Sequence, residues 1–165
     1  MLYNKSHKGL YLYGTCGGDE LSKELRAKAD VFSQQWNTLN TFYEEYAKSV
    51  GFTYSSLSIF CVIFNNENCT QKIICEQTYL PKQTVNNVIT NFYKKKYIYM
   101  VELAEDRRIK TIHLTPEGLQ LAKKILPVVS DVEENAIGQF TEEEADTLLQ
   151  LLKRYVAYCD KNMPR

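Results

Sequence analysis

The most constraining feature of the sequence is a pair of short helical segments joined by a tight turn. Thr70 is a good N-cap for a helix that runs to about residue 77. A Thr-Tyr-Leu turn then leads to Pro81, whose fixed φ suits the first position of a new helix. Apolar side chains at i, i+3, i+4 and i+7 predict that this helix runs to about residue 95; they are Val85, Val88, Ile89 and Phe92. Two short helices this close together predict a helix-turn-helix.

Two β-rich runs follow the second helix. Residues 97–103 and 109–114 are rich in β-branched and aromatic side chains, and a charged run, Ala-Glu-Asp-Arg-Arg, joins them. This pattern predicts a hairpin with a charged tip. Residues 70–114 are therefore expected to form a winged helix-turn-helix within a mainly α-helical fold.

The outward face of the second helix carries amides, hydroxyls and lysines. Asn and Gln can pair with adenine edges, and Lys can reach guanine or phosphate. A merely solvated helix face normally contains Glu as well as Lys, but no acidic residue lies between Pro81 and Tyr99. The side chains expected to contact DNA from this helix are Lys82, Gln83, Thr84, Asn86, Asn87, Thr90 and Lys94, with Gln83 and Asn87 foremost. Thr70 and Lys110 are added from the neighbouring elements.

The tip of the hairpin supplies a second kind of contact. Asp106 can hold one of the two arginines, Arg107 and Arg108, while the other projects. An arginine on a thin β-wing has the right size for the narrow minor groove.

Charge is distributed unevenly along a chain whose formal net charge is zero. Residues 81–114 hold seven basic against three acidic residues, whereas residues 1–80 hold seven against eight and residues 115–165 hold six against nine. Positive charge concentrated in one segment is the expected footprint of a phosphate-contacting surface.

The whole chain is expected to form a single domain with long helices at both ends. We expect an irregular arm over residues 1–18, terminal helices over residues 19–52 and 115–165, and the winged-helix lobe over residues 53–114. Thr115 with Pro116, and Thr141 with Glu144, are start signals for the last two helices. The terminal helices carry more apolar side chains than the small lobe can cover. We therefore expect a twofold homodimer, the alternative being a monomer in which these helices fold back.

Composition argues against several other classes. A hydrophobic content of 44% favours a globular protein, and neither a membrane-spanning run nor a signal peptide is recognisable, so we expect a cytoplasmic protein that does not bind membranes. Five cysteines without a CxxC pair, together with two histidines, predict no metal site, cofactor or catalytic centre. The hypothesis of an enzyme that uses Cys16 and His7 rests only on the presence of both residues in the sequence.

The motifs between residues 80 and 118 resemble those of the multiple antibiotic resistance regulator (MarR) family. The resemblance covers roughly residues 20–160 and is carried by Leu80-Pro81-Lys82-Gln83-Thr84-Val85, Asp106-Arg107-Arg108 and Leu114-Thr115-Pro116-Glu117-Gly118. It implies a homodimeric regulator, usually a repressor, that binds a palindromic operator in double-stranded DNA. The family's wing arginine corresponds to Arg108 and its aspartate partner to Asp106.

The resemblance also implies control by a small phenolic or lipophilic effector bound between the dimerisation helices and the lobe. Candidate pocket residues are Trp36, Tyr43, Phe60 and Phe64, although aromatic side chains on such stripes are more often plain core. Some relatives sense oxidants through a cysteine, but Cys16 lies in a Gly-rich arm without the hydrophobic surroundings of that branch. Two alternatives thus stay open: a winged-helix module that binds another protein, and a thiol-based redox sensor.

Overall fold

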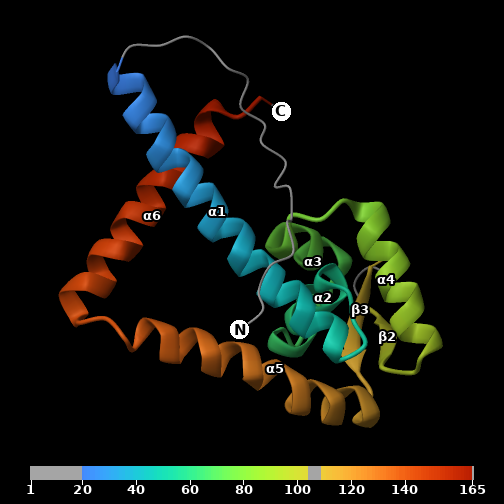
Figure 1. Ribbon diagram of the computed structural model, residues 1–165. Coiled ribbons are helices and arrows are strands. Elements are labelled where there is room, and N and C mark those ends of the chain that lie inside the picture. Colours follow the sequence, from blue (N-terminus) through green and yellow to red (C-terminus); the bar gives the residue numbers. More distant parts are fainter. Residues whose placement is uncertain (1–19, 104–108, 165) are drawn as a thin grey trace. The chain divides into compact units, whose positions relative to one another are not determined.

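The computed structural model describes residues 20–103 and 109–164 (Figure 1). The chain divides into two units, Met1–Ile59 and Phe60–Arg165, and the boundary falls inside the second helix. In chain order the elements are α1 (Glu20–Ser49), α2 (Tyr54–Asn65), β1 (Cys69–Thr70), α3 (Gln71–Thr78), α4 (Lys82–Lys94), β2 (Ile98–Glu102), β3 (Lys110–Leu114), α5 (Pro116–Ile137) and α6 (Glu142–Asn162). The predicted fold class, mainly helical with a small β-wing, is confirmed.

The first unit shows why α1 stops where the sequence predicts. Gly51 takes a left-handed conformation with φ of 81°, which glycine adopts without steric cost. Its N–H donates to the Lys48 carbonyl at 3.1 Å, and the N–H of Phe52 donates to the Ala47 carbonyl at 2.8 Å. These two bonds close the last turn as a Schellman motif. Thr53 then caps α2 by accepting the N–H of Ser56 at 3.1 Å.

The helix-turn-helix lies in the second unit. Thr70 caps α3 as predicted, because its side chain accepts the N–H of Ile73 at 3.3 Å. The buried stripe of α4 consists of Val85, Ile89 and Phe92. Phe92 meets Phe60 of α2 edge-on, with 5.3 Å between ring centroids.

The start of α4 differs by one residue from the prediction. We expected Pro81 to be the first helical residue, but it is the N-cap, and Lys82 begins the helix. The φ of Pro81, −58°, suits a helix, yet its ψ of 141° is extended. This conformation still lets the Pro81 carbonyl accept the N–H of Val85 at 3.1 Å. Proline fixes only φ, so the sequence could not distinguish the two positions.

The sheet contains one strand more than the predicted hairpin. β2 and β3 pair antiparallel, with Met100 opposite Ile112, and β1 pairs with the other edge of β3, with Cys69 opposite Ile112. The strand order is β1-β3-β2. β1 spans only two residues, so it has no alternating pattern from which a strand could be predicted.

The end of α4 is joined to the start of α5. The backbone N–H of Thr115 donates to the Tyr97 carbonyl at 3.0 Å, and its hydroxyl donates to the Lys96 carbonyl at 2.7 Å. The same hydroxyl oxygen caps α5 by accepting the N–H of Gly118 at 3.1 Å. Gly118 lies so close to the Tyr97 carbonyl that a β-carbon there would overlap it. The Thr-Pro-Glu-Gly sequence thus fixes where the wing returns to the helices.

The last two helices are only partly covered. The first half of α5 is buried through Ala122, Ile125 and Leu126, whereas no described residue of α6 is buried. The predicted capping box is present at α6, because Thr141 and Glu144 exchange side-chain and backbone hydrogen bonds. α5 leads away from the sheet, and α6 turns back from its end (Figure 1).

Among the described helices, none is by itself long and apolar enough to cross a membrane. α1 and α2 taken together pass that test by length and composition, but they are bent by 78° at the break between them.

We predict that Gly118→Ala lowers the free energy of unfolding by about 1–3 kcal/mol, the usual cost of overpacking. The new methyl group would overlap a backbone carbonyl, which can move only if β2 or α5 moves with it. Gly138→Ala is the matched control. Gly138 has a right-handed φ of −64°, and the nearest atom to its added β-carbon is the Glu134 carbonyl at 3.3 Å. Urea denaturation of both full-length variants should show a clearly larger loss for Gly118, and equal losses would contradict this role.

Candidate nucleic-acid interface

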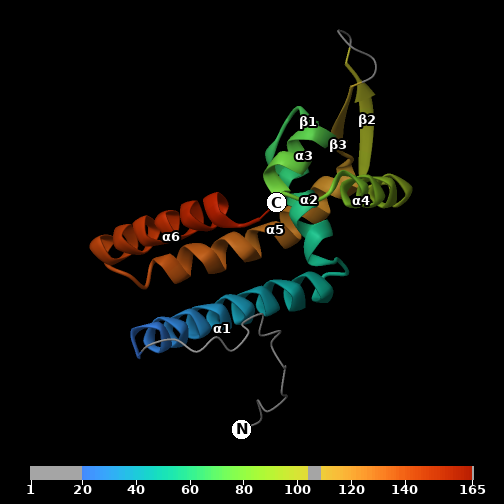
Figure 2. The ribbon, with the colours of Figure 1, turned by 90° about the horizontal axis from the view of Figure 1, so that it is seen from above.

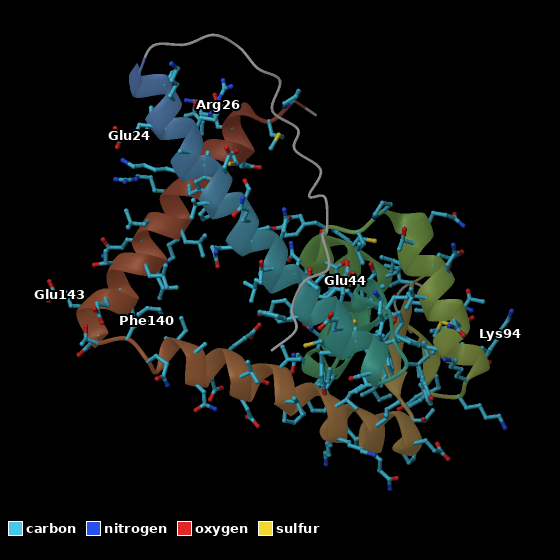
Figure 3. All side chains as sticks on the ribbon, in the orientation of Figure 1. Glu24, Arg26, Glu44, Lys94, Phe140 and Glu143 are labelled. Atoms are coloured by element: carbon cyan, nitrogen blue, oxygen red, sulfur yellow. The ribbon has the colours of Figure 1, made fainter. Side chains whose placement is uncertain are left out.

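The side chains of α4 divide into a buried and an exposed face. Val85, Ile89 and Phe92 pack inward, and the opposite face is formed by exposed polar and basic side chains: Lys82, Gln83, Asn86, Asn87, Thr90 and Lys94. Thr84 is half-buried at the edge of this face. Lys94 extends outward from α4 (Figure 3). The exposed face has the polar groups and the positive charge that contact with a nucleic acid requires.

Hydrogen bonds within the exposed face orient its amides. The Gln83 side-chain N–H donates to the Asn87 side-chain oxygen at 3.2 Å, one helical turn along. Within the described part of the chain, this bond leaves the Asn87 amide nitrogen to donate and the Gln83 carbonyl oxygen to accept. A donor beside an acceptor is the combination that pairs with the major-groove edge of adenine.

Asn86 is held from the neighbouring helix. Gln71 at the start of α3 donates a side-chain N–H to the Asn86 side-chain oxygen at 3.5 Å. Thr90 donates its hydroxyl to the Asn86 backbone carbonyl at 2.8 Å. The predicted residues Asn86 and Thr90 therefore lie together, and Gln71 is a neighbour that the sequence analysis did not identify.

Two predicted residues outside α4 have structural partners. Thr70 is half-buried and caps α3, so its hydroxyl oxygen already accepts a backbone N–H. Lys110, at the start of β3, lies 3.7 Å from the Glu102 carboxylate across the hairpin. Both partners of this pair are more than half exposed, so it contributes little to stability and leaves the Lys110 ammonium accessible.

The wing extends from the lobe as a two-stranded ribbon. Figure 2 shows β2 and β3 reaching past the helices of the second unit. The last described residue before the tip is Leu103, whose N–H donates to the Ile109 carbonyl at 3.0 Å. Asp106, Arg107 and Arg108 lie outside the described residues.

Comparisons with known proteins agree with this arrangement, although no protein-family model matches the sequence. The chain is 28% identical over 116 residues to the HTH-type transcriptional regulator SarZ of Staphylococcus epidermidis, covering 69% of this chain and 76% of SarZ. Its fold matches a MarR/EmrR family transcriptional regulator from Acinetobacter sp. ADP1, with a TM-score of 0.66 and 25% identity over 82% of this chain and 96% of that one. In sequence and in fold, the chain is thus similar to transcriptional regulators of the MarR family.

A third similar structure is the MepR–DNA complex of Staphylococcus aureus. The TM-score is 0.66 at 22% identity, and the match covers 77% of this chain and 97% of MepR. At this identity the likeness concerns the fold. The helix-turn-helix and the wing, which the sequence predicted, are thus elements that this chain shares with the MarR-family fold.

Two further residues beside α4 stand out in the structure, and the sequence analysis missed both. Tyr79, in the turn before α4, and Lys96, just after α4, are the non-glycine residues with positive φ among the described residues, at 55° and 58°. Tyr79 is also 92% exposed. Helices commonly end in glycine at such positions, so a tyrosine there was a signal present in the sequence.

The candidate effector residues lie on α1 and α2. Trp36 of α1 stacks on Phe32, with 6.2 Å between ring centroids, and Tyr43 approaches Tyr54 at 5.9 Å. Phe64 is half-buried, whereas Phe60 is fully buried and packs against Phe92 and Tyr97. The surroundings of Phe60 are those of a core residue.

Two cysteines of the described segments, Cys61 and Cys69, have thiols with a raised pKa. Burial raises the pKa of the Cys69 thiol to about 11. Burial, with the nearby Glu133 carboxylate, also raises the pKa of Cys61. A raised pKa disfavours the nucleophilic thiolate. Cys16 and His7 lie outside the described residues, and within the described ones no cluster of three or more His, Cys, Asp or Glu side chains could hold a metal ion.

Proposed function

We propose that this protein is a DNA-binding transcriptional regulator, a repressor that binds a palindromic operator as a homodimer and is released by a small effector. The observation that carries the proposal is the exposed face of α4, with its ordered amides and lysines, on a helix-turn-helix beside a β-wing. The existence of a MepR complex with DNA, in the same fold, supports it. A repressor acts where operator DNA lies, so we also propose a cytoplasmic location.

The exposed face of α4 would enter the major groove. Gln83 and Asn87 present an acceptor beside a donor, and Asn86 adds a second amide nearby. Lys82 and Lys94 would contact phosphates at the two ends of the helix, while Thr84 and Thr90 supply shorter polar contacts. Bidentate amide contacts to bases contribute discrimination of about 1–3 kcal/mol each.

The wing would contact the neighbouring minor groove. Arg108, held by Asp106, is proposed to enter this groove, with Arg107 and Lys110 contacting the backbone on either side of the wing. A narrow minor groove has an enhanced negative potential, which attracts arginine. The base of this ribbon is fixed by its register with β1, so the tip would move together with the helix-turn-helix.

The terminal helices would form the dimer. Large apolar side chains are exposed on α1, on the second half of α5 and on α6, among them Phe42, Val132, Leu149 and Val156. Apolar surface of this extent on a water-soluble chain marks an interaction site. We propose that residues 19–52 and 115–165 pair with their copies around a twofold axis, which would place one α4 in each half-site of the operator.

We predict that Asn87→Ala weakens binding to the duplex upstream of the protein's own gene by about 1–3 kcal/mol, with little change on a random duplex. Arg108→Ala should weaken binding to both duplexes and make it less sensitive to salt, because it removes a cation from the negative potential of the minor groove. Gln150→Ala, on the polar face of α6, is the control. Fluorescence anisotropy at two salt concentrations measures all three. The proposal fails if the wild type does not bind at low salt, or if the double variant of Asn87 and Arg108 binds as well as the wild type.

We predict that Leu149→Glu combined with Val156→Glu abolishes the dimer. Two carboxylates would then have to be buried in an apolar interface, which is unfavourable unless they are paired. Sedimentation should give twice the 19.2 kDa chain mass for the wild type and for the control Gln150→Glu, and the single mass for the double variant. A monomeric wild type would refute the dimer.

We propose that the effector is a small phenolic or lipophilic molecule and that its contacts come from the candidate residues Trp36, Tyr43, Phe60 and Phe64. Trp36 is the single tryptophan of the chain, so its fluorescence reports on this region alone. A binding phenol should change that fluorescence saturably and release the DNA over the same concentration range. Release without a fluorescence change would place the effector elsewhere.

One observation favours a second function, that of a protein-interaction module. β2 is an edge strand, and its residues Tyr99, Met100 and Val101 are exposed. Edge strands with apolar side chains can pair with an extended segment of another protein. Affinity capture that recovers a stoichiometric partner and no DNA would favour this module over the repressor.

A further inference from the structure

The turn between α3 and α4 contains a residue whose identity the fold does not explain. Tyr79 has φ of 55° and ψ of 17°, which is the left-handed region. Bulky side chains rarely adopt this conformation, because the β-carbon crowds the following carbonyl group, whereas glycine adopts it freely. Tyr79 closes α3 by donating its backbone N–H to the Cys75 carbonyl at 3.0 Å. A glycine would make the same bond at a lower conformational cost.

The side chain of Tyr79 contributes almost nothing to the stability of the fold. It is 92% exposed, so its ring is not stabilised by packing. A single exposed tyrosine is ordinary on a protein surface, but one held in a disfavoured backbone conformation is not. Lys96, the other left-handed residue, is a cation at the end of α4, where the helix dipole favours positive charge. No comparable effect accounts for a tyrosine at residue 79.

The location of Tyr79 indicates a ligand. In helix-turn-helix proteins the first helix crosses the DNA backbone, and the N-terminal end of the second enters the major groove. The turn between them therefore passes a phosphate strand. Tyr79 lies in this turn, three residues before Lys82, the first residue of α4. Tyrosine hydroxyls are common donors to phosphate oxygens.

We propose that Tyr79 contacts the DNA backbone, with its phenol hydroxyl donating a hydrogen bond to a phosphate oxygen beside the groove that α4 enters. This assignment rests on the proposed function. The contact is sequence-independent, because phosphate oxygens are the same at every base pair. It is also uncharged on the protein side, so it releases no counterion.

The test uses the full-length protein and two fluorescent duplexes of equal length, one from upstream of its own gene and one of random sequence. Tyr79→Phe removes only the hydroxyl and should raise Kd about ten- to a hundredfold on both duplexes, as expected for one hydrogen bond to a charged group. The slope of affinity against salt should not change. Tyr54→Phe, which removes the hydroxyl of another exposed tyrosine at the start of α2, should bind like the wild type.

Tyr79→Gly separates a functional role from a structural one. It should raise the melting temperature, because the left-handed conformation suits glycine, while it weakens DNA binding at least as much as Tyr79→Phe. A Tyr79→Phe protein with wild-type affinity, or a loss confined to the upstream duplex, would overturn the phosphate contact while the proposed function stands. A wild type that binds neither duplex would overturn both.

Discussion

The missing side chain of Gly118 permits the close approach on which the rest of the lobe depends. Because Gly118 lies against the Tyr97 carbonyl, Thr115 can reach Lys96 and Tyr97, just after α4, with its hydroxyl and its backbone N–H. Three elements meet here: the end of α4, the base of the wing and the start of α5. The angle between α4 and the wing is therefore set by a few contacts of Thr115 and Gly118, and the exposed side chains of α4 do not have to maintain it.

This separation of roles explains how the exposed face of α4 can be so polar. α4 packs through its buried stripe and through the Phe60–Phe92 contact, and the exposed side chains of Gln83, Asn86 and Asn87 take no part in this apolar packing. Their hydrogen bonds to one another and to Gln71 restrict their rotamers before any ligand arrives. An ordered polar face loses less entropy on binding than a mobile one, so pre-ordering favours affinity as well as selectivity.

Most of the fold could be predicted because its start and stop signals are local. Thr70, Thr115 and Thr141 each cap a helix through bonds to residues within three positions, and Gly51 ends α1 through its own backbone. The errors arose where tertiary structure decided the conformation. β1 forms only because β3 is beside it, and Pro81 became a cap through its ψ, which proline does not fix. The contact of Gln71 with Asn86 follows no sequence period, and the left-handed backbone of Tyr79 was signalled only by the lack of a glycine after α3.

The strand order β1-β3-β2 has a mechanical consequence. β3 is hydrogen-bonded on both edges, to the strand that precedes α3 and to the outer strand of the wing, so a displacement of either is transmitted to the other. The helix-turn-helix and the wing would thus move together as one rigid body. In the proposed dimer, a body of fixed shape can leave its operator only if its distance from the second copy changes, because half-sites recur once per turn of DNA, about 34–36 Å apart. An effector would then act on the distance between the two copies, and a small rotation of each copy would produce a large displacement at the wing.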